Sequence, residues 1–155
     1  MIIRPLRPEE YGVLPGFLYE AIFIPEGAEP PDRSIVFRPE LALYYREFGK
    51  GRGDLAMAAE EDGEIVGCAW TRLMHDYGYV DDETPSFAVA VLEPYRSRGI
   101  GTALMKSMLK TLKAHGFHQA SLSVQKENPA FRLYRRLGFS VIDDREEEVL
   151  MVCPL

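Results

Sequence analysis

The sequence predicts a mixed α/β fold of the α+β type, in which helices flank a mostly antiparallel sheet. Short apolar segments with strand-like alternation recur along the chain, and the turn signal Asp62-Gly63 joins two of them. Ile100, Leu104 and Met108 repeat at i, i+4 spacing, as on the buried face of a helix. With 155 residues and 46% hydrophobic side chains, the chain is long enough for one domain with a sizeable core.

The first third of the chain is expected to be mostly helix and loop. Residues 1–6 form a short strand, and an apolar pattern at helical spacing follows from Pro8, made irregular by Pro15 and Gly16. Four prolines predict a loop without regular structure over 24–39, and Pro39 suits the first turn of a helix that runs to about Phe48.

The rest of the chain is expected to supply the sheet. Residues 54–60 and 65–74 form an antiparallel hairpin, and a strand over 84–92 precedes the apolar-striped helix, which Gly116 ends. A strand over 119–124, a short helix over 128–137 and two closing strands over 139–143 and 148–153 follow. These segments add up to about seven strands and about four helices, without repeats or linkers.

Charge is distributed unevenly along the chain. The net charge of −6 argues against a general nucleic-acid binder and against a lysine-rich membrane-surface protein. Residues 95–126 carry six basic and no acidic side chains, whereas residues 1–94 carry eight basic and 18 acidic ones. This asymmetry favours an anionic ligand at one side of the site and a cationic partner at the other.

The two cysteines and the hydrophobicity profile indicate a cytoplasmic protein. Cys68 and Cys153 lie 85 positions apart in apolar surroundings, which favours buried free thiols. No signal peptide and no run of about 18 apolar residues is present, so no membrane association is expected.

A run between a strand and the apolar helix has the features of an anion site. Two glycines spaced by one residue permit a tight turn, and the amides of the first helical turn point outward with the positive end of the helix dipole. An isolated Gly-x-Gly is more often a plain connection, but here two arginines and the helix start coincide with it. A dinucleotide fingerprint would need glycine or alanine at Leu104, and a P-loop needs a Gly-Lys-Ser/Thr that is absent. The run is Arg96-Ser97-Arg98-Gly99-Ile100-Gly101-Thr102.

Two motifs together resemble one family. Arg96-x-x-Gly99-x-Gly101, after a strand and opening a helix, is similar to the acetyl-coenzyme A (acetyl-CoA) motif of the GNAT acyltransferase superfamily. The run from Asn128 to Phe139, with Tyr134 inside it and Gly-Phe at its end, is similar to the Asn-to-Tyr helix of that family. The resemblance implies one GNAT domain over residues 1–155, with its sheet splayed at the centre.

The resemblance also implies a set of ligand contacts, with acetyl-CoA as the acyl donor and no metal. The backbone of Val89, Ala90 and Val91 would face the pantetheine arm inside the splay. Asn128 would bond the pantetheine portion, and Tyr134 would lie near the thioester sulfur. The pyrophosphate would bind the anion site, whose residues are Arg96, Ser97, Arg98, Gly99, Ile100, Gly101 and Thr102.

The implied reaction is direct acetyl transfer from the thioester to an amine. Tyr134 would protonate the leaving sulfur, since a phenol with a pKa near 10 keeps its proton at pH 7. The family often places a glutamate base on one of two central strands, but this chain has serines and a phenylalanine there. The base therefore stays open among a water chain and the acids Glu26, Glu29, Asp81, Asp82 and Glu83, which together suggest an acidic mouth that attracts a cationic amine.

The sequence thus predicts an acetyl-CoA-dependent N-acetyltransferase that acts on a primary amine of a small molecule or peptide. One alternative is a protein N-terminal or lysine acetyltransferase, which would need an open groove. Another is a non-catalytic acyl-CoA binding module, which the tyrosine speaks against. The residues leave open the acceptor, acyl groups other than acetyl, and the oligomeric state, a homodimer included.

Overall fold

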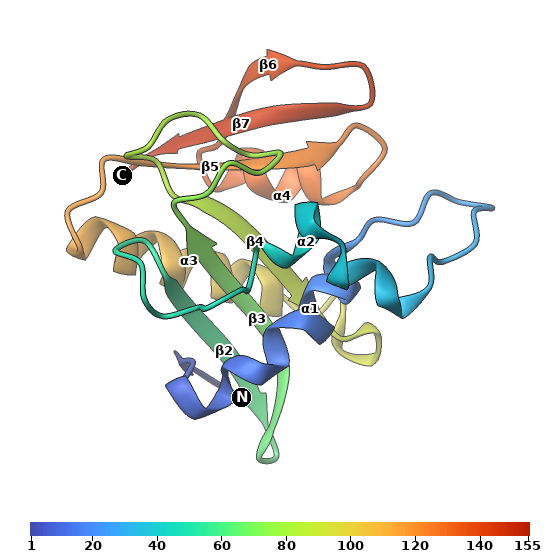
Figure 1. Cartoon of the computed structure of the whole chain (residues 1–155), viewed down its shortest axis with the longest axis vertical. Coiled ribbons are helices and arrows are strands. Elements are labelled where there is room, and N and C mark those ends of the chain that lie inside the picture. The colour runs from blue at the N-terminus through green and yellow to red at the C-terminus, as the bar shows by residue number, and fades with distance from the viewer.

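The computed structural model describes residues 1–155 and contains one open seven-stranded sheet with the strand order β1-β2-β3-β4-β5-β7-β6 (Figure 1). Every neighbouring pair is antiparallel except β4 and β5, which run parallel. The predicted mixed, mostly antiparallel sheet is confirmed. Its strands are β1 (Ile2–Pro5), β2 (Leu55–Glu61), β3 (Glu64–Arg72), β4 (Ser86–Val91), β5 (Gln119–Gln125), β6 (Ser140–Asp144) and β7 (Glu148–Pro154).

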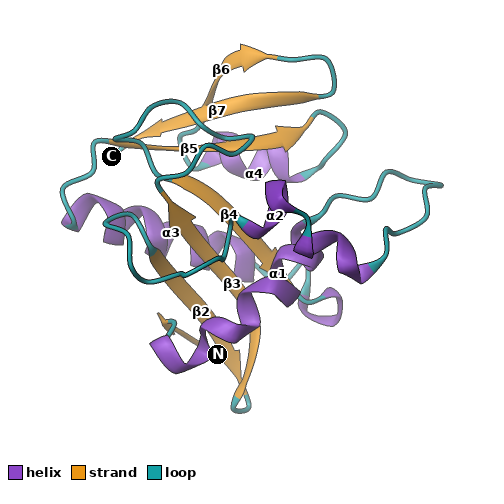
Figure 2. Cartoon of the chain, viewed as in Figure 1, coloured by secondary structure: helices purple, strands orange, loops and turns teal.

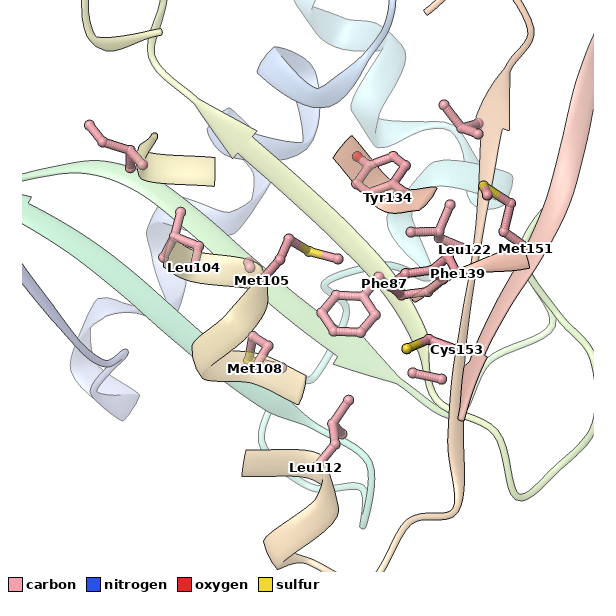
Figure 3. Packing of buried hydrophobic residues seen from close by; sticks show 14 of the residues in the cluster. Phe87, Leu104, Met105, Met108, Leu112, Leu122, Tyr134, Phe139, Met151 and Cys153 are labelled. Atoms are coloured by element: carbon pink, nitrogen blue, oxygen red, sulfur yellow. The ribbon is translucent and has the colours of Figure 1, made fainter. Parts of the chain in front are cut away.

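Helices cover both faces of the sheet (Figure 2). On one face lie α3 (Ile100–Ala114) and α4 (Ala130–Arg136), and on the other lie α1 (Leu14–Ala21) and α2 (Pro39–Ala42). The predicted stripe of α3 is buried, and Figure 3 shows Leu104, Met105, Met108 and Leu112 lined up along it. A 3-10 helix over Pro8–Val13 precedes α1, whereas Pro15 and Gly16, where the irregularity was expected, lie inside α1, with Pro15 in its first turn. No helix is both long and apolar enough to cross a membrane.

The sheet separates into two halves between β4 and β5. One residue pair, Ser86 with Ser121, joins these strands, and beyond it they diverge (Figure 1). The segment at Gly78 closes the narrow end, because Ser121 Oγ donates to the carbonyl of Gly78 at 2.6 Å and a Cβ at Gly78 would lie 2.4 Å from Ser86 Oγ. The facing edges of β4 and β5 are thus open along most of their length.

Two expectations about residues 24–48 are wrong. The proline-rich segment contains a 3-10 helix over Arg33–Phe37, where prolines are absent and the Asp32 side chain accepts from the Ser34 amide at 2.9 Å. The helix expected to reach about Phe48 ends at Ala42 and continues as turns.

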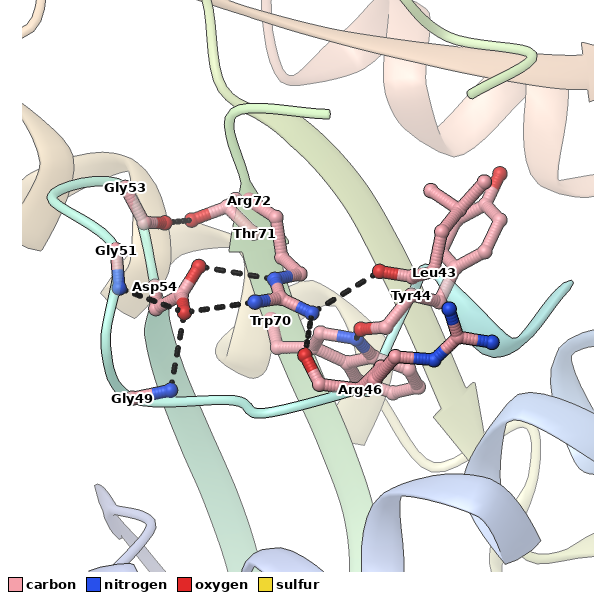
Figure 4. Close-up of polar contacts among 10 residues, drawn as sticks. All are labelled: Leu43, Tyr44, Arg46, Gly49, Gly51, Gly53, Asp54, Trp70, Thr71 and Arg72. Carbon is pink, nitrogen blue, oxygen red and sulfur yellow. Dashed lines mark hydrogen bonds and ion pairs between the residues drawn. The ribbon is translucent and has the colours of Figure 1, made fainter. Parts of the chain in front are cut away.

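Side chains of β3 explain the early end of α2. Arg72 donates to the carbonyls of Leu43 and Arg46, and Trp70 Nε1 donates to the carbonyl of Tyr44 at 3.0 Å (Figure 4). A longer helix would have used these carbonyls itself. The turn that carries Tyr44 is therefore fixed to the middle of the sheet.

Candidate active site

The start of α3 has the backbone geometry that the predicted anion site requires. Gly99 precedes the helix with a φ of +82°, a left-handed conformation that favours glycine. The first intrahelical bond here runs from the Ala103 amide to the Gly99 carbonyl at 3.1 Å, so the amides of Ile100, Gly101 and Thr102 have no acceptor within the helix. Nothing lies within 4 Å of a Cβ placed on Gly99, so the space beside it is open.

The two arginines of this run are bound to the protein. Arg96 Nε donates to the Val91 carbonyl at 2.8 Å, and its Nη2 lies 3.4 Å from a carboxylate oxygen of Glu20. Arg98 lies over the ring of Tyr95 and pairs loosely with an acid of β2 at 3.7 Å. Arg96 therefore fixes the end of β4 against α1, a role that the motif alone did not indicate.

A basic hollow of about 750 Å³ lies beside the start of α4. Asn128 belongs both to this hollow and to the cavity in the splay, and its Oδ1 accepts from the Ala130 amide at 3.0 Å, which leaves its Nδ2 group free to donate. The residues that line the hollow are Lys126, Glu127, Asn128, Pro129, Phe131, Arg132, Arg135 and Arg136.

A second cavity, of about 430 Å³, occupies the splay between β4 and β5. Thirteen of its 18 lining residues are hydrophobic, which gives it largely apolar walls. Val89 of β4 and Asn128 lie on it, so it brings together a residue of the open strand and a residue of the second motif. Ile22, Ile35 and Leu41 line it from the segment that precedes and contains α2.

Tyr134 lies on this cavity. The side chain is 8% exposed, and its ring packs edge-on against Phe139 with the centroids 6.0 Å apart, as the neighbouring rings of Figure 3 illustrate. No protein group makes a hydrogen bond to its hydroxyl, and burial raises the pKa of Tyr134 to about 12. The hydroxyl keeps its proton at neutral pH and is available to a bound molecule.

The acids of the cavity come from an unexpected segment. Glu147 and Glu148, at the start of β7, line it, whereas all five acids proposed from the sequence are exposed and lie outside the lining. The acidic run from Asp143 to Glu148 is visible in the sequence and could have suggested acids for the site. The sequence did not indicate that the final hairpin brings two of them to the cavity. No cluster of three or more His, Cys, Asp or Glu side chains is placed to hold a metal ion.

Aromatic residues divide between cavity and core. Tyr44 and Tyr77 line the cavity, whereas Trp70 is fully buried in the core. Tyr79 lies outside the cavity and donates to Asp82 at 2.8 Å. The buried free thiols, Cys68 and Cys153, are as expected.

Comparison with known proteins decides the family. A model described as the acetyltransferase (GNAT) family matches residues 20–139, more than half of the chain. The chain belongs to the GNAT family of acetyltransferases. An N-alpha-acetyltransferase of Sulfurisphaera tokodaii is 35% identical to this GNAT protein over 114 residues, which are 63% of this chain and 67% of the relative. One from Sulfolobus acidocaldarius is 32% identical over 136 residues, covering 76% and 80%.

The fold of this GNAT protein has close structural counterparts. The yncA protein of Salmonella typhimurium, solved with acetyl-CoA, superposes with a TM-score of 0.72 at 20% identity, over 100% of this chain and 94% of the other. The chain is an acetyl-CoA-dependent acetyltransferase with the expected GNAT fold. The residues of the chain fit acetyl-CoA. The open edge of β4 and the amides at the start of α3 have no hydrogen-bond partner in the protein, so the polar groups of the donor can pair with them.

Proposed function

We propose that this GNAT protein transfers the acetyl group of acetyl-CoA to the α-amine of a peptide whose first side chain is apolar. The cavity in the splay carries the proposal, because it places the Tyr134 hydroxyl, apolar walls and two glutamates around one space. An apolar side chain would bury its surface against Ile22, Ile35 and Leu41, while a glutamate attracts the ammonium. The names of the two archaeal relatives also support an α-amine acceptor.

The donor would bind across β4 and α3. The pyrophosphate would accept hydrogen bonds from the amides of residues 97–102, in the open space beside Gly99. The pantetheine amides would pair with the open edge of β4 at Val89, Ala90 and Val91, and Asn128 Nδ2 would donate to them. The basic hollow beside Asn128 suits the remaining phosphate of the donor.

The chemistry requires that two protons leave the acceptor nitrogen. The ammonium loses one before attack, and the nitrogen loses the other while its bond to the acetyl carbon forms and the carbon–sulfur bond breaks. Tyr134 would give its hydroxyl proton to the leaving sulfur and regain one from the attacking nitrogen. Overall, one proton ends on the thiol and one in solvent.

An acceptor panel tests the proposal. We expect acetyl-CoA to release free thiol with a peptide that begins with leucine. The same peptide with a blocked N-terminus and an internal lysine should react at least tenfold more slowly. A peptide that begins with aspartate should also react at least tenfold more slowly, because the cavity has apolar and acidic walls. Equal rates with the blocked peptide would contradict the α-amine assignment.

The other acceptor classes are outcomes of the same panel. Because the segment around α2 covers one side of the cavity, a small-molecule amine is the second candidate, and it would react while every peptide fails. Binding of acetyl-CoA without thiol release from any amine would instead identify an acyl-CoA binding module.

A pair of reciprocal variants tests the two halves of the proposed site. Tyr134→Phe should lower kcat about 100-fold or more, because it removes the acid, and should leave the acetyl-CoA affinity unchanged. Gly99→Glu should have the opposite effect, because it should weaken acetyl-CoA binding rather than lower kcat. The glutamate would be strained at a left-handed residue, and its carboxylate would lie beside the free amides. Calorimetry with acetyl-CoA and thiol release measure both. Undiminished donor affinity in Gly99→Glu, or full turnover in Tyr134→Phe, would remove that residue from the site.

A further inference from the structure

The sequence offered no base on the central strands, and the structure contains a buried carboxylate that no other part of the mechanism uses. Asp76 lies in the loop between β3 and β4, where its Oδ2 accepts from Tyr44 Oη at 2.8 Å and from Ser86 Oγ at 2.7 Å. Its Oδ1 is buried and has no hydrogen-bond partner. A buried carboxylate oxygen without a partner costs stability, and such an exception calls for an explanation, of which a catalytic role is one.

Tyr44 connects this carboxylate to the active site. Its ring lines the cavity that also holds Tyr134, and its hydroxyl donates to Asp76. Trp70 and Arg72 fix the turn that carries Tyr44 (Figure 4). The tyrosine is therefore held where it lines the cavity and bonds Asp76.

We propose that Tyr44 passes the first proton of the acceptor ammonium to Asp76. The ammonium donates its proton to Tyr44 Oη while the Tyr44 hydroxyl proton moves to Asp76 Oδ2. The products of this step are a neutral amine, an unchanged tyrosine and a neutral Asp76 carboxyl, which returns the proton to solvent after turnover. The inference rests on the proposed function, since it concerns the same cavity and an amine acceptor.

The surroundings of Asp76 suit a proton acceptor. Burial raises the pKa of Asp76, and the hydroxyls of Ser86 and Tyr44, together with the backbone amide of Gly78, offset this only in part. Burial and the nearby Asp76 charge raise the pKa of Tyr44 as well, so it carries its proton at neutral pH and acts as a relay.

The other ionisable groups near this corner do not neutralise Asp76. Tyr77 and Glu148 act on Tyr44 electrostatically, and Glu148 adds negative charge on the cavity side. Arg145 donates to the carbonyl of Tyr77 and pairs with Asp143 and Glu148. From β4 and β5, the neighbours are the uncharged side chains of Ser86 and Ser121.

The pH profile of kcat/KM, measured with acetyl-CoA and the leucine-first peptide, tests the relay in Asp76→Asn. A peptide α-amine has a pKa of about 8, so about 1% of it is neutral at pH 6. The variant must rely on that fraction and should be about 100-fold slower than the wild type at pH 6 and nearly equal at pH 9. Tyr44→Phe should show the same profile, and the double variant should be no slower than either single one.

A second Tyr–Asp pair on the same loop provides the control. Tyr79→Phe and Asp82→Asn break a hydrogen bond of equal length, 2.8 Å, outside the cavity, and their profiles should superpose on the wild type. A loss in Asp76→Asn that is constant from pH 6 to 9 would show a purely structural role, and no loss at pH 6 would exclude the relay. If one variant fails to fold, the other still decides. A wild type without turnover would instead refute the proposed function.

Discussion

Two acidic side chains are connected to the turn after α2, Asp54 through Arg72 and Asp76 through Tyr44. They differ in the charge of the side chains that donate to them. Asp54 faces a cation, because Arg72 donates to both of its oxygens at 3.0 and 3.1 Å (Figure 4). Asp76 has no arginine or lysine partner, and its side-chain donors are the neutral hydroxyls of Tyr44 and Ser86. Burial among neutral groups makes the Asp76 carboxylate take up a proton more readily, whereas Asp54 has a cationic partner at hydrogen-bond distance.

The difference assigns the two corners different tasks. Asp54 also accepts from the amides of Gly49 and Gly51, so all its donors fix the chain around β2 and β3. Asp76 retains one oxygen without a partner and touches a residue of the cavity. The first corner stabilises the turn that holds Tyr44, and the second connects that turn to the proposed chemistry.

The largest expected effect is on stability, in Asp54→Asn. The variant leaves Arg72, 14% exposed, without its anionic partner, and breaking such a buried pair costs about 3 kcal/mol of the free energy of unfolding. Denaturant unfolding followed by circular dichroism measures it. Because Arg72 also holds the carbonyl of Leu43, turnover should fall by a similar factor at every pH, unlike in Asp76→Asn.

An exposed ion pair is the matched control for this prediction. Arg52 and Glu83 lie 2.8 Å apart with side chains 56% and 81% exposed, so Glu83→Gln should cost less than about 0.5 kcal/mol. If Asp54→Asn cost no more than this control, the Asp54 corner would not be a stabilising element.

The contrast also marks what the sequence alone could predict. Strands, α3 and the turn at Gly99 follow from periodicity and from glycine, which act over a few residues, and they agree with the structure. Tyr134 came from a motif within one short helix. These features depend on residues that are close in the sequence, so they can be predicted from it.

The remaining parts of the site depend on contacts between distant segments. Tyr44 and Asp76 are 32 positions apart. Tyr44 was expected inside a helix, but that helix stops before it, and Trp70 of β3 bonds its carbonyl instead. Glu148 reaches the cavity because the last hairpin continues the sheet beyond β5. The arginine of the motif, Arg96, bonds a strand carbonyl instead of staying free. Sequence periodicity does not predict contacts between such distant segments.

A smaller effect than that of Asp54→Asn is expected on the stability of Asp76→Asn. Asparagine keeps an oxygen for the two hydroxyl donors and removes the buried charge, so the free energy of unfolding at pH 7 should change by about 1 kcal/mol or less. The pKa of Asp76 is higher in the folded state than its ordinary 3.8, so the folded wild type takes up a proton before the unfolded chain does. Wild-type stability relative to the variant should therefore rise as the pH falls from neutral, and the gain is complete only below the ordinary pKa of 3.8. Unfolding at pH 7 and pH 4 measures this, and a difference that stays constant or shrinks toward acid would mean that burial does not favour the protonated form of Asp76.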